Sequence, residues 1–108
     1  MMQRISAARL SEWLGQASSV KPVLLDVREP WEFETCHIAG SRLMPMNSVP
    51  AHHIDLEKSA ATVVICHHGM RSLQIAMFLE RQGFTNVINL DGGVAAWAQQ
   101  VDSAMPTY

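Results

Sequence analysis

The fold is decided by residues 62–83, which read Thr62-Val-Val-Ile-Cys66-His-His-Gly-Met-Arg-Ser72-Leu-Gln-Ile-Ala-Met-Phe-Leu-Glu-Arg-Gln-Gly83. Residues 63–65 are β-branched in succession, which is typical of a short strand buried on both faces. From Ser72 onward the apolar residues recur at helical spacing, and Gly83 stands where a helix commonly ends. We therefore expect Cys66 at the carboxyl end of a buried strand, followed by a short polar loop and a helix N-terminus.

This placement favours a reactive thiol at Cys66. The first turn of a helix presents unpaired N–H groups and about half a positive charge, and a tight loop aims further N–H groups inward. Both features stabilise a thiolate. His67, His68 and Arg71 add hydrogen-bonding or positive groups around the same point. The alternative is a buried, inert cysteine that simply ends a strand.

Composition limits the class of protein. A chain of 108 residues with 48% hydrophobic and 17% charged residues is expected to form one globular domain. A formal charge of −2 gives no reason to expect nucleic acid or an anionic membrane as a partner. No apolar run approaches the roughly 18 residues that span a bilayer, and the start lacks the apolar segment of a secretory signal. Two cysteines without metal-type spacing indicate reduced thiols, so we expect a cytoplasmic protein.

The remaining elements alternate along the chain. Strands are expected at residues 3–5, 23–27, 42–44, 62–65 and 86–90. Helices are expected at residues 7–14 (with Ser6 as the N-cap), 31–36 (stopped by Gly40), 49–57, 72–83 and 94–101. This alternation predicts an α/β fold with a parallel sheet covered on both faces. The tail over residues 102–108 is expected to be loose.

Four motifs resemble those of the rhodanese-like sulfurtransferases. They are Leu25-Asp-Val-Arg-Glu29, His37-Ile-Ala-Gly-Ser41, Cys66-His-His-Gly-Met-Arg-Ser72 and Leu90-Asp-Gly-Gly93 with Trp97. The resemblance covers residues 3–100 as a single domain and leaves 101–108 as a C-terminal tail. It implies a three-layer α/β fold in which helices flank a central five-strand parallel sheet. It also implies that Cys66 carries a persulfide between two half-reactions.

The chemistry implied by this resemblance agrees with a thiolate at a strand end. Cys66 attacks the outer sulfur of a donor such as thiosulfate, and an acceptor (cyanide in an assay, a cellular thiol or a sulfur-accepting protein in life) then takes that sulfur. Mercaptopyruvate remains open as a donor, because the loop matches neither donor class closely. Neither a cofactor nor a nucleic-acid or membrane partner is expected.

The substrate-binding residues are expected in the loop itself: His67, His68, Gly69, Met70, Arg71 and Ser72. Gly69 permits the tight curvature that points loop N–H groups inward. Arg71 either holds the anionic end of the donor or faces water. For Asp26 and Arg28 the resemblance implies a support for the loop region, and a surface or structural pairing is the favoured role.

Other polar residues have simpler interpretations. His37 is expected to be a structural hydrogen-bonder, and His52 and His53 are expected to face solvent. Cys36 is expected to be a structural thiol, with a resolving cysteine for Cys66 as the alternative. No pair of residues has the Cys-x-x-Cys or i, i+4 histidine spacing that zinc sites favour, so no metal site is expected.

Two other functions remain as alternatives. Phosphatases and arsenate reductases of related fold use a Cys-x5-Arg loop around a tetrahedral oxyanion, whereas Cys66 to Arg71 is Cys-x4-Arg. The smaller ring favours sulfur over phosphate. The other alternative is a non-catalytic binding module, which in this family often lacks the cysteine. The presence of Cys66 in a polar loop argues against it.

Overall fold

The computed structural model describes residues 2–108 as one α/β domain. Its strands are β1 (Gln3–Ile5), β2 (Val23–Asp26), β3 (Arg42–Leu43), β4 (Thr62–Ile65) and β5 (Val87–Leu90). Its helices are α1 (Ala7–Gly15), α2 (Pro30–Thr35), α3 (Val49–His52), α4 (Met70–Arg81) and α5 (Gly93–Gln100), with 3-10 turns η1 (Met46–Ser48) and η2 (His53–Asp55). The strands form one parallel sheet in the order β1-β5-β4-β2-β3, which confirms the predicted architecture.

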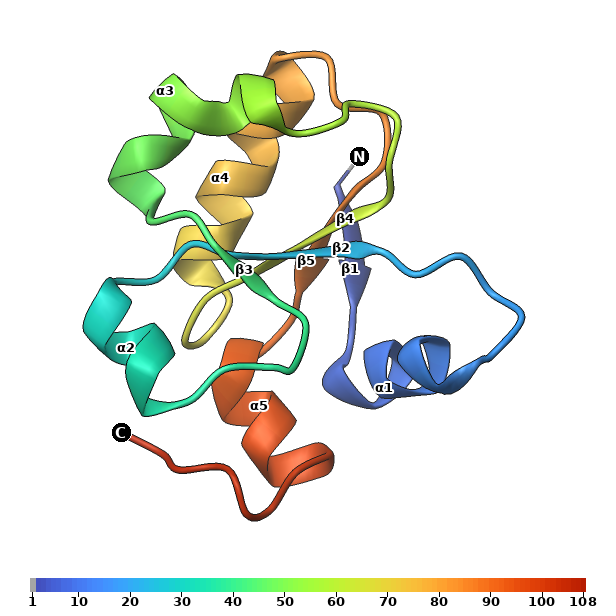
Figure 1. Ribbon diagram of the computed structural model, residues 1–108, viewed down its shortest axis with the longest axis vertical. Helices are drawn as coiled ribbons and strands as arrows, with labels where there is room; N and C mark the ends of the chain where they lie inside the picture. The colour runs from blue at the N-terminus through green and yellow to red at the C-terminus, as the bar shows by residue number, and fades with distance from the viewer. Residues whose placement is uncertain (1) are drawn as a thin grey trace.

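Helices cover both faces of the sheet, with α1 and α5 on one face and α3 and α4 on the other (Figure 1). Successive strand side chains point to opposite faces. Val63 and Ile65 therefore pack in the α1/α5 core, whereas Val64 and Cys66 pack in the core beneath α4. No helix in residues 2–108 combines the length and apolar character needed to cross a membrane.

The position of β4 explains why distant motifs meet. β4 lies between β2 and β5, and its register pairs Ile65 with Asp26 at the end of β2. Parallel strands bring their carboxyl ends to one edge of the sheet, and ligands of open α/β sheets bind outside that edge. The segments that follow Asp26, Ile65 and Leu90 are thereby collected around Cys66.

The bounds of α1 and α5 differ from the predictions by one residue at one or both ends, and those of α4 and α2 differ for reasons that the backbone shows. Helix α4 begins at Met70, two residues before the predicted start, because Gly69 adopts φ 102° and turns the chain directly into the helix. Helix α2 ends at Thr35, where the backbone of Cys36 becomes extended, so Gly40 does not stop it.

The predicted helix over residues 49–57 is wrong as a single element. The structure instead has η1, the single turn α3 and η2 in succession. Proline is tolerated in the first turn of a helix, so Pro50 does not cause the break. The break comes at His53, whose carbonyl accepts from the N–H of Leu56 in a 3-10 turn, so the α-helical ladder does not continue.

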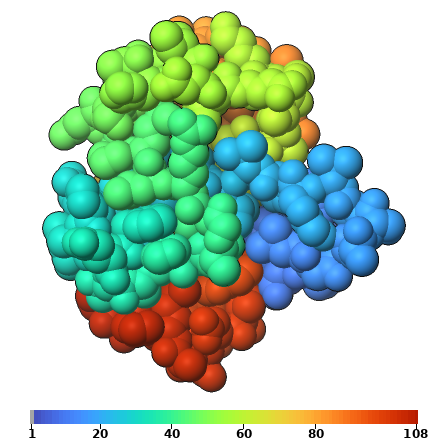
Figure 2. Space-filling model, viewed as in Figure 1, coloured from blue at the N-terminus to red at the C-terminus, as the bar shows by residue number. Residues whose placement is uncertain are grey.

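The expectation of a loose tail is also wrong. Met105 is buried, and the Tyr108 ring meets the Trp31 ring edge-on with centroids 5.3 Å apart. In Figure 2 the C-terminal part of the chain, coloured red, lies against the cyan segment that contains α2. Apolar and aromatic partners on α2 and in the core therefore hold the end of the chain against the domain.

Candidate active site

The sulfur of Cys66 lies just beyond β4 and is almost completely buried. The backbone N–H of Gly69 donates a hydrogen bond to Sγ at 3.0 Å, and the Ser72 hydroxyl oxygen lies 3.3 Å from the same sulfur. Gly69 makes this contact from a left-handed conformation, φ 102°, which strongly favours glycine. A backbone donor aimed at a buried sulfur stabilises negative charge on it.

The start of helix α5 orients the loop after Cys66. The backbone N–H of Val94 donates to the Cys66 carbonyl at 2.9 Å, and that of Ala95 donates to the His67 carbonyl at 3.1 Å. In a trans peptide the carbonyl and the following N–H point in opposite directions. The N–H groups of His67 and His68 are therefore turned away from α5, toward the side where the Cys66 side chain lies.

This contact between the loop and α5 depends on the glycines that precede the helix. Gly92 and Gly93 have φ values of 78° and 58°, in the left-handed region. A Cβ at Gly93 would stand 2.2 Å from the carbonyl oxygen of Cys66 and 2.5 Å from that of His67. The Asp-Gly-Gly motif therefore allows helix and loop to approach this closely.

A buried polar network supports the loop from the side of β5. The Ser72 hydroxyl donates to Asn89 Oδ1 at 2.5 Å, and the Asn89 amide donates to the carbonyl of Gly69 at 3.3 Å. Sequence analysis missed Asn89. The available signal was a polar residue within the otherwise apolar strand β5, whose four residues are all buried.

Arg71, at the end of the loop, is held by Glu32 of α2. Its Nη1 and Nη2 donate to Glu32 Oε1 and Oε2 at 2.8 and 2.9 Å, a two-point pairing. The hydrogen bonds from Arg71 outweigh burial and lower the pKa of Glu32 to about 2, with further help from the backbone of Glu29. Sequence analysis missed Glu32. Its spacing from Glu29 fits a capping box, but no local pattern pointed to Arg71.

Asp26 and Arg28 form a fully buried ion pair, with Nη2 2.7 Å from Oδ2. Burial lowers the pKa of Arg28, but the hydrogen bonds to Asp26 and Tyr108 more than offset it, so the pKa lies above its ordinary value. Arg28 also donates to the carbonyl of Cys36 at 2.7 Å. The expected structural pairing of Asp26 with Arg28 is confirmed. The alternative, a pairing at the surface, is wrong because both side chains are fully buried.

Tyr108, the last residue, joins the two ion pairs. Its hydroxyl donates to Glu32 Oε2 at 2.7 Å and accepts from Arg28 Nη1 at 2.8 Å. Burial is the main cause that raises the pKa of Tyr108 to about 12. Its ring stacks on His67, with centroids 4.1 Å apart and an interplanar angle of 16°. No pattern in the tail indicated this role.

A comparison with family models identifies the domain. Residues 6–100 match the model of the rhodanese-like domain. The chain belongs to the rhodanese-like family. A solved structure described as a rhodanese-like domain protein from Staphylococcus aureus superposes with a TM-score of 0.82, at 28% identity, over 89% of this chain and 91% of that one.

Two relatives of this rhodanese-like domain have similar lengths. A sulfurtransferase from Allochromatium vinosum is 33% identical over 92% of this chain and 91% of its own length. A thiosulfate sulfurtransferase GlpE from Pseudomonas fluorescens is 40% identical over 69% of each chain. The match spans only 30% of a chloroplastic rhodanese-like/PpiC protein of Arabidopsis thaliana and 26% of a probable adenylyltransferase/sulfurtransferase MoeZ of Mycobacterium tuberculosis.

The other predicted positions of the rhodanese-like domain fall outside this network. His68 and Met70 are exposed to solvent, Met70 by 72%. His37 hydrogen-bonds the carbonyl of Phe33 at 2.9 Å, as expected of a structural role. His52 is exposed as predicted.

The prediction for His53 is wrong, because its ring lies edge-on to Phe78 and Phe84 and its Nδ1 is buried. Cys36 is buried, and its sulfur lies 4.0 Å from Arg28 Nη1. Within residues 2–108, no three His, Cys, Asp or Glu side chains gather closely enough to hold a metal ion.

Proposed function

We propose that this rhodanese-like domain is a sulfurtransferase that carries sulfane sulfur as a persulfide on Cys66. The observation that carries the proposal is the hydrogen bond from the Gly69 N–H to Sγ, in a loop whose carbonyls are turned toward α5. A backbone N–H aimed at the sulfur suits the negative charge that the outer sulfur of a persulfide carries. The sulfurtransferase names of relatives at 33% and 40% identity support the same chemistry.

The reaction proceeds in two displacements. The Cys66 thiolate attacks the sulfane sulfur of thiosulfate, the sulfur–sulfur bond of the donor breaks, and sulfite leaves with the bonding pair. An acceptor thiolate then attacks the outer sulfur of the persulfide, and the bonding pair returns to Cys66. Covalent catalysis of this kind divides one transfer into two easier steps.

The residues around Cys66 have distinct proposed roles. Gly69 and Ser72 contact the sulfur, and His67, His68 and Met70 line the mouth that a substrate crosses. Arg71 contributes positive charge near the mouth while Glu32 holds its guanidinium. The buried Asp26–Arg28 pair supports the framework around the loop. The acceptor is either a small thiol or a sulfur-accepting protein.

The spacing of the loop argues against phosphatase activity. Cys66 to Arg71 is Cys-x4-Arg, one residue shorter than a phosphatase loop, so its ring is too small for phosphate. Arg71 also pairs with Glu32 through both terminal nitrogens, which offsets the positive charge that it would present to an oxyanion. We expect negligible turnover of aryl phosphates.

The test is the intact mass of the protein after incubation with thiosulfate and, separately, with mercaptopyruvate. The proposal predicts the gain of one sulfur atom, removable by cyanide, with at least one donor. The Cys66→Ser variant should gain none. A folded wild-type protein that gains no sulfur from either donor overturns the proposal and favours a non-catalytic binding module.

A further inference from the structure

Asn89 is a buried polar residue in the otherwise apolar strand β5, and its side chain contacts the active-site loop. The Ser72 hydroxyl donates to its Oδ1 at 2.5 Å. Its Nδ2 donates to the carbonyl of Gly69 at 3.3 Å and to Asp91 Oδ1 at 3.4 Å. A buried amide is tolerated when its polar groups are paired, and both ends of this amide have partners.

The partners of Asn89 determine which way its amide points. A carbonyl oxygen and a carboxylate accept hydrogen bonds and donate none, and the Asp91 carboxylate is itself paired with Arg4 at 3.0 Å. The amide nitrogen must therefore face Gly69 and Asp91, which leaves the amide oxygen facing Ser72. Because an amide oxygen only accepts, the single hydroxyl hydrogen of Ser72 is committed to Asn89.

This commitment sets the polarity that Ser72 presents to Cys66. The Ser72 oxygen lies 3.3 Å from Sγ. With its hydrogen on Asn89, the oxygen offers lone pairs to the sulfur, which suits a thiol S–H and opposes a thiolate. The Gly69 N–H, 3.0 Å from Sγ, acts in the opposite sense and favours negative charge. The charge on the sulfur therefore depends on where the Ser72 hydrogen points.

We propose that Asn89 is a positioning residue that holds the Ser72 hydrogen away from Cys66 and thereby raises the pH at which Cys66 forms a thiolate. The inference rests on the proposed sulfurtransferase function, in which the thiolate is the nucleophile of the first displacement and the leaving group of the second. In the persulfide the inner sulfur carries neither a proton nor a charge, so it does not compete with Asn89 for the hydroxyl. Asn89 thus favours the loaded persulfide over the free thiolate.

Other charged and titratable groups surround the loop and also influence the sulfur. They are Arg71 of α4, His67 and His68 of the loop, Glu32 of α2, Asp26 and Arg28 at the end of β2, Tyr108 of the tail, Arg4 of β1, and Asp91 after β5. Burial is the main cause that lowers the pKa of His67. All these groups stay in place in the variants below, so their contributions are common to every protein compared.

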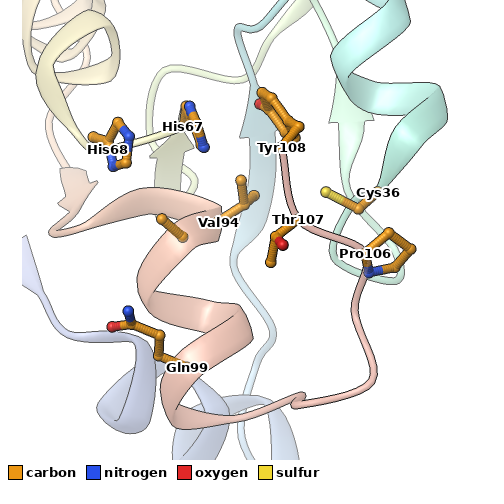
Figure 3. Close-up of a pocket in the computed structure, with 9 residues that line it drawn as sticks. Cys36, His67, His68, Val94, Gln99, Pro106, Thr107 and Tyr108 are labelled. Carbon is orange, nitrogen blue, oxygen red and sulfur yellow. The ribbon is translucent and has the colours of Figure 1, made fainter.

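The cavity drawn in Figure 3 is separate from this arrangement. It has a volume of about 260 Å³ and lies against α5, with His67, His68 and Tyr108 in its lining. None of the described residues that line it is Cys66, Ser72 or Asn89. The contacts that orient the Ser72 hydroxyl therefore come from β5 and the loop, on the other side from this cavity.

Titration of the thiolate in four proteins tests the inference. All four carry Cys36→Ser, so that Cys66 is the only thiol: the parent, Asn89→Leu, Ser72→Ala and the double variant of Asn89 and Ser72. The thiolate is followed by its ultraviolet absorbance against pH, with Cys66→Ser in the same background as the blank. Tyr108 is the only tyrosine, and its pKa of about 12 keeps phenolate absorbance out of the range.

Asn89→Leu frees the Ser72 hydroxyl to donate to the thiolate, so the titration midpoint should move down by about one pH unit relative to the same substitution in the Ser72→Ala protein. Any loosening of the Gly69 donor after loss of the Asn89 bond contributes equally in both backgrounds. Equal shifts in the two backgrounds would show that Asn89 only supports the loop, and would overturn the inference. Asn89→Val, with a β-branched side chain that suits a strand, is made in parallel and should give the same result.

Sulfur loading separates this inference from the function on which it rests. The gain of one sulfur atom from thiosulfate is measured on the same proteins by intact mass, and its pH profile should move with the titration midpoint. A parent protein that titrates but loads no sulfur from thiosulfate or mercaptopyruvate would overturn the proposed function. The comparison of thiolate midpoints needs no sulfur transfer, so it decides the role of Asn89 in either case.

Discussion

The sulfurs of Cys66 and Cys36 are both buried, and their neighbours distinguish them. The sulfur of Cys66 accepts a backbone N–H at 3.0 Å beyond the end of a strand. Cys36 follows the last residue of α2, and its sulfur lies 4.0 Å from Nη1 of Arg28. A thiol becomes an effective nucleophile through such surroundings, so burial does not separate a reactive thiol from a structural one.

The first prediction separates these two residues. Cys66→Ser should abolish transfer of sulfur from thiosulfate to cyanide, because a serine hydroxyl is not ionised near neutral pH and holds no persulfide. Cys36→Ser should keep most of the activity. The measurement is the transfer rate of both variants, with thermal melts to confirm folding. An inactive but folded Cys36→Ser protein would show that both thiols are needed, as in a relay.

The second prediction concerns Glu32 and acid stability. Its pKa is lowered from 4.5 to about 2 in the folded protein. A lowered folded-state pKa contributes stability above the unfolded value, and this contribution is lost as the pH falls toward 2. Glu32→Gln has no carboxylate to protonate. Its urea midpoint should therefore fall less than that of the wild type between about pH 5 and pH 2.

The control for this experiment is Glu34→Gln, at an exposed position of the same helix. It should retain the wild-type pH dependence. Parallel curves for the wild type and Glu32→Gln over the acid range would show that the pair with Arg71 contributes little to stability.

At the scale of elements, the contact between α5 and the active-site loop fixes the orientation of the loop backbone. The first turn of α5 donates to the carbonyls of Cys66 and His67, which uses N–H groups that a helix N-terminus otherwise leaves unpaired. The same contact turns the following N–H groups toward the sulfur side. Helix α4 completes the arrangement, because Gly69 at its start donates directly to Sγ.

The third prediction tests this contact with two glycines of positive φ. Gly40→Ala, at φ 85° with no atom within 4 Å of the added Cβ, should cost only the left-handed strain of about 1–2 kcal/mol. Gly93→Ala carries the same strain and also places a Cβ 2.2 Å from the carbonyl of Cys66. It should lose more stability in urea denaturation and load sulfur more slowly. Equal effects of the two substitutions on loading would show that α5 does not orient the loop.

At the scale of the whole molecule, the buried Asp26–Arg28 pair connects parts that are far apart in sequence. Arg28 bonds to Asp26 at the end of β2, to the carbonyl of Cys36 after α2, and to Tyr108 at the end of the chain. A buried charge that loses its partner is strongly destabilising, whereas loss of both partners is better tolerated. The stability of the domain should therefore depend on the pair as a unit.

The fourth prediction follows from this dependence. Arg28→Met leaves the Asp26 carboxylate buried without its partner and should cost about 3–5 kcal/mol. For a domain of this size each kcal/mol corresponds to roughly 4–8 °C in Tm. The double variant with Asp26→Leu should recover part of the loss. A double variant less stable than Arg28→Met would show that the unpaired carboxylate is not the source of the loss.

The sequence by itself determined the local features of this domain. The β-branched run of residues 63–65 and the helical spacing after it placed Cys66 at a strand end, and the alternation of elements predicted the parallel sheet. The β-branched run and the helical spacing are short-range patterns in the sequence. They are present because the strand is buried on both faces and the helix on one. The start of α4 differs from its predicted position because the left-handed backbone of a single residue, Gly69, sets it.

Only the tertiary structure decided which polar side chains meet at the site. Arg71 pairs with Glu32 across 39 positions of the chain, and Tyr108 reaches Glu32 across 76. A local pattern shows that a residue is charged or aromatic, but its partner depends on how α2, the loop and the tail pack together. In the sequence, residues 92 and 93 look like an ordinary glycine turn. Only the packing of α5 against the active-site loop shows that this turn makes the close contact that orients the loop.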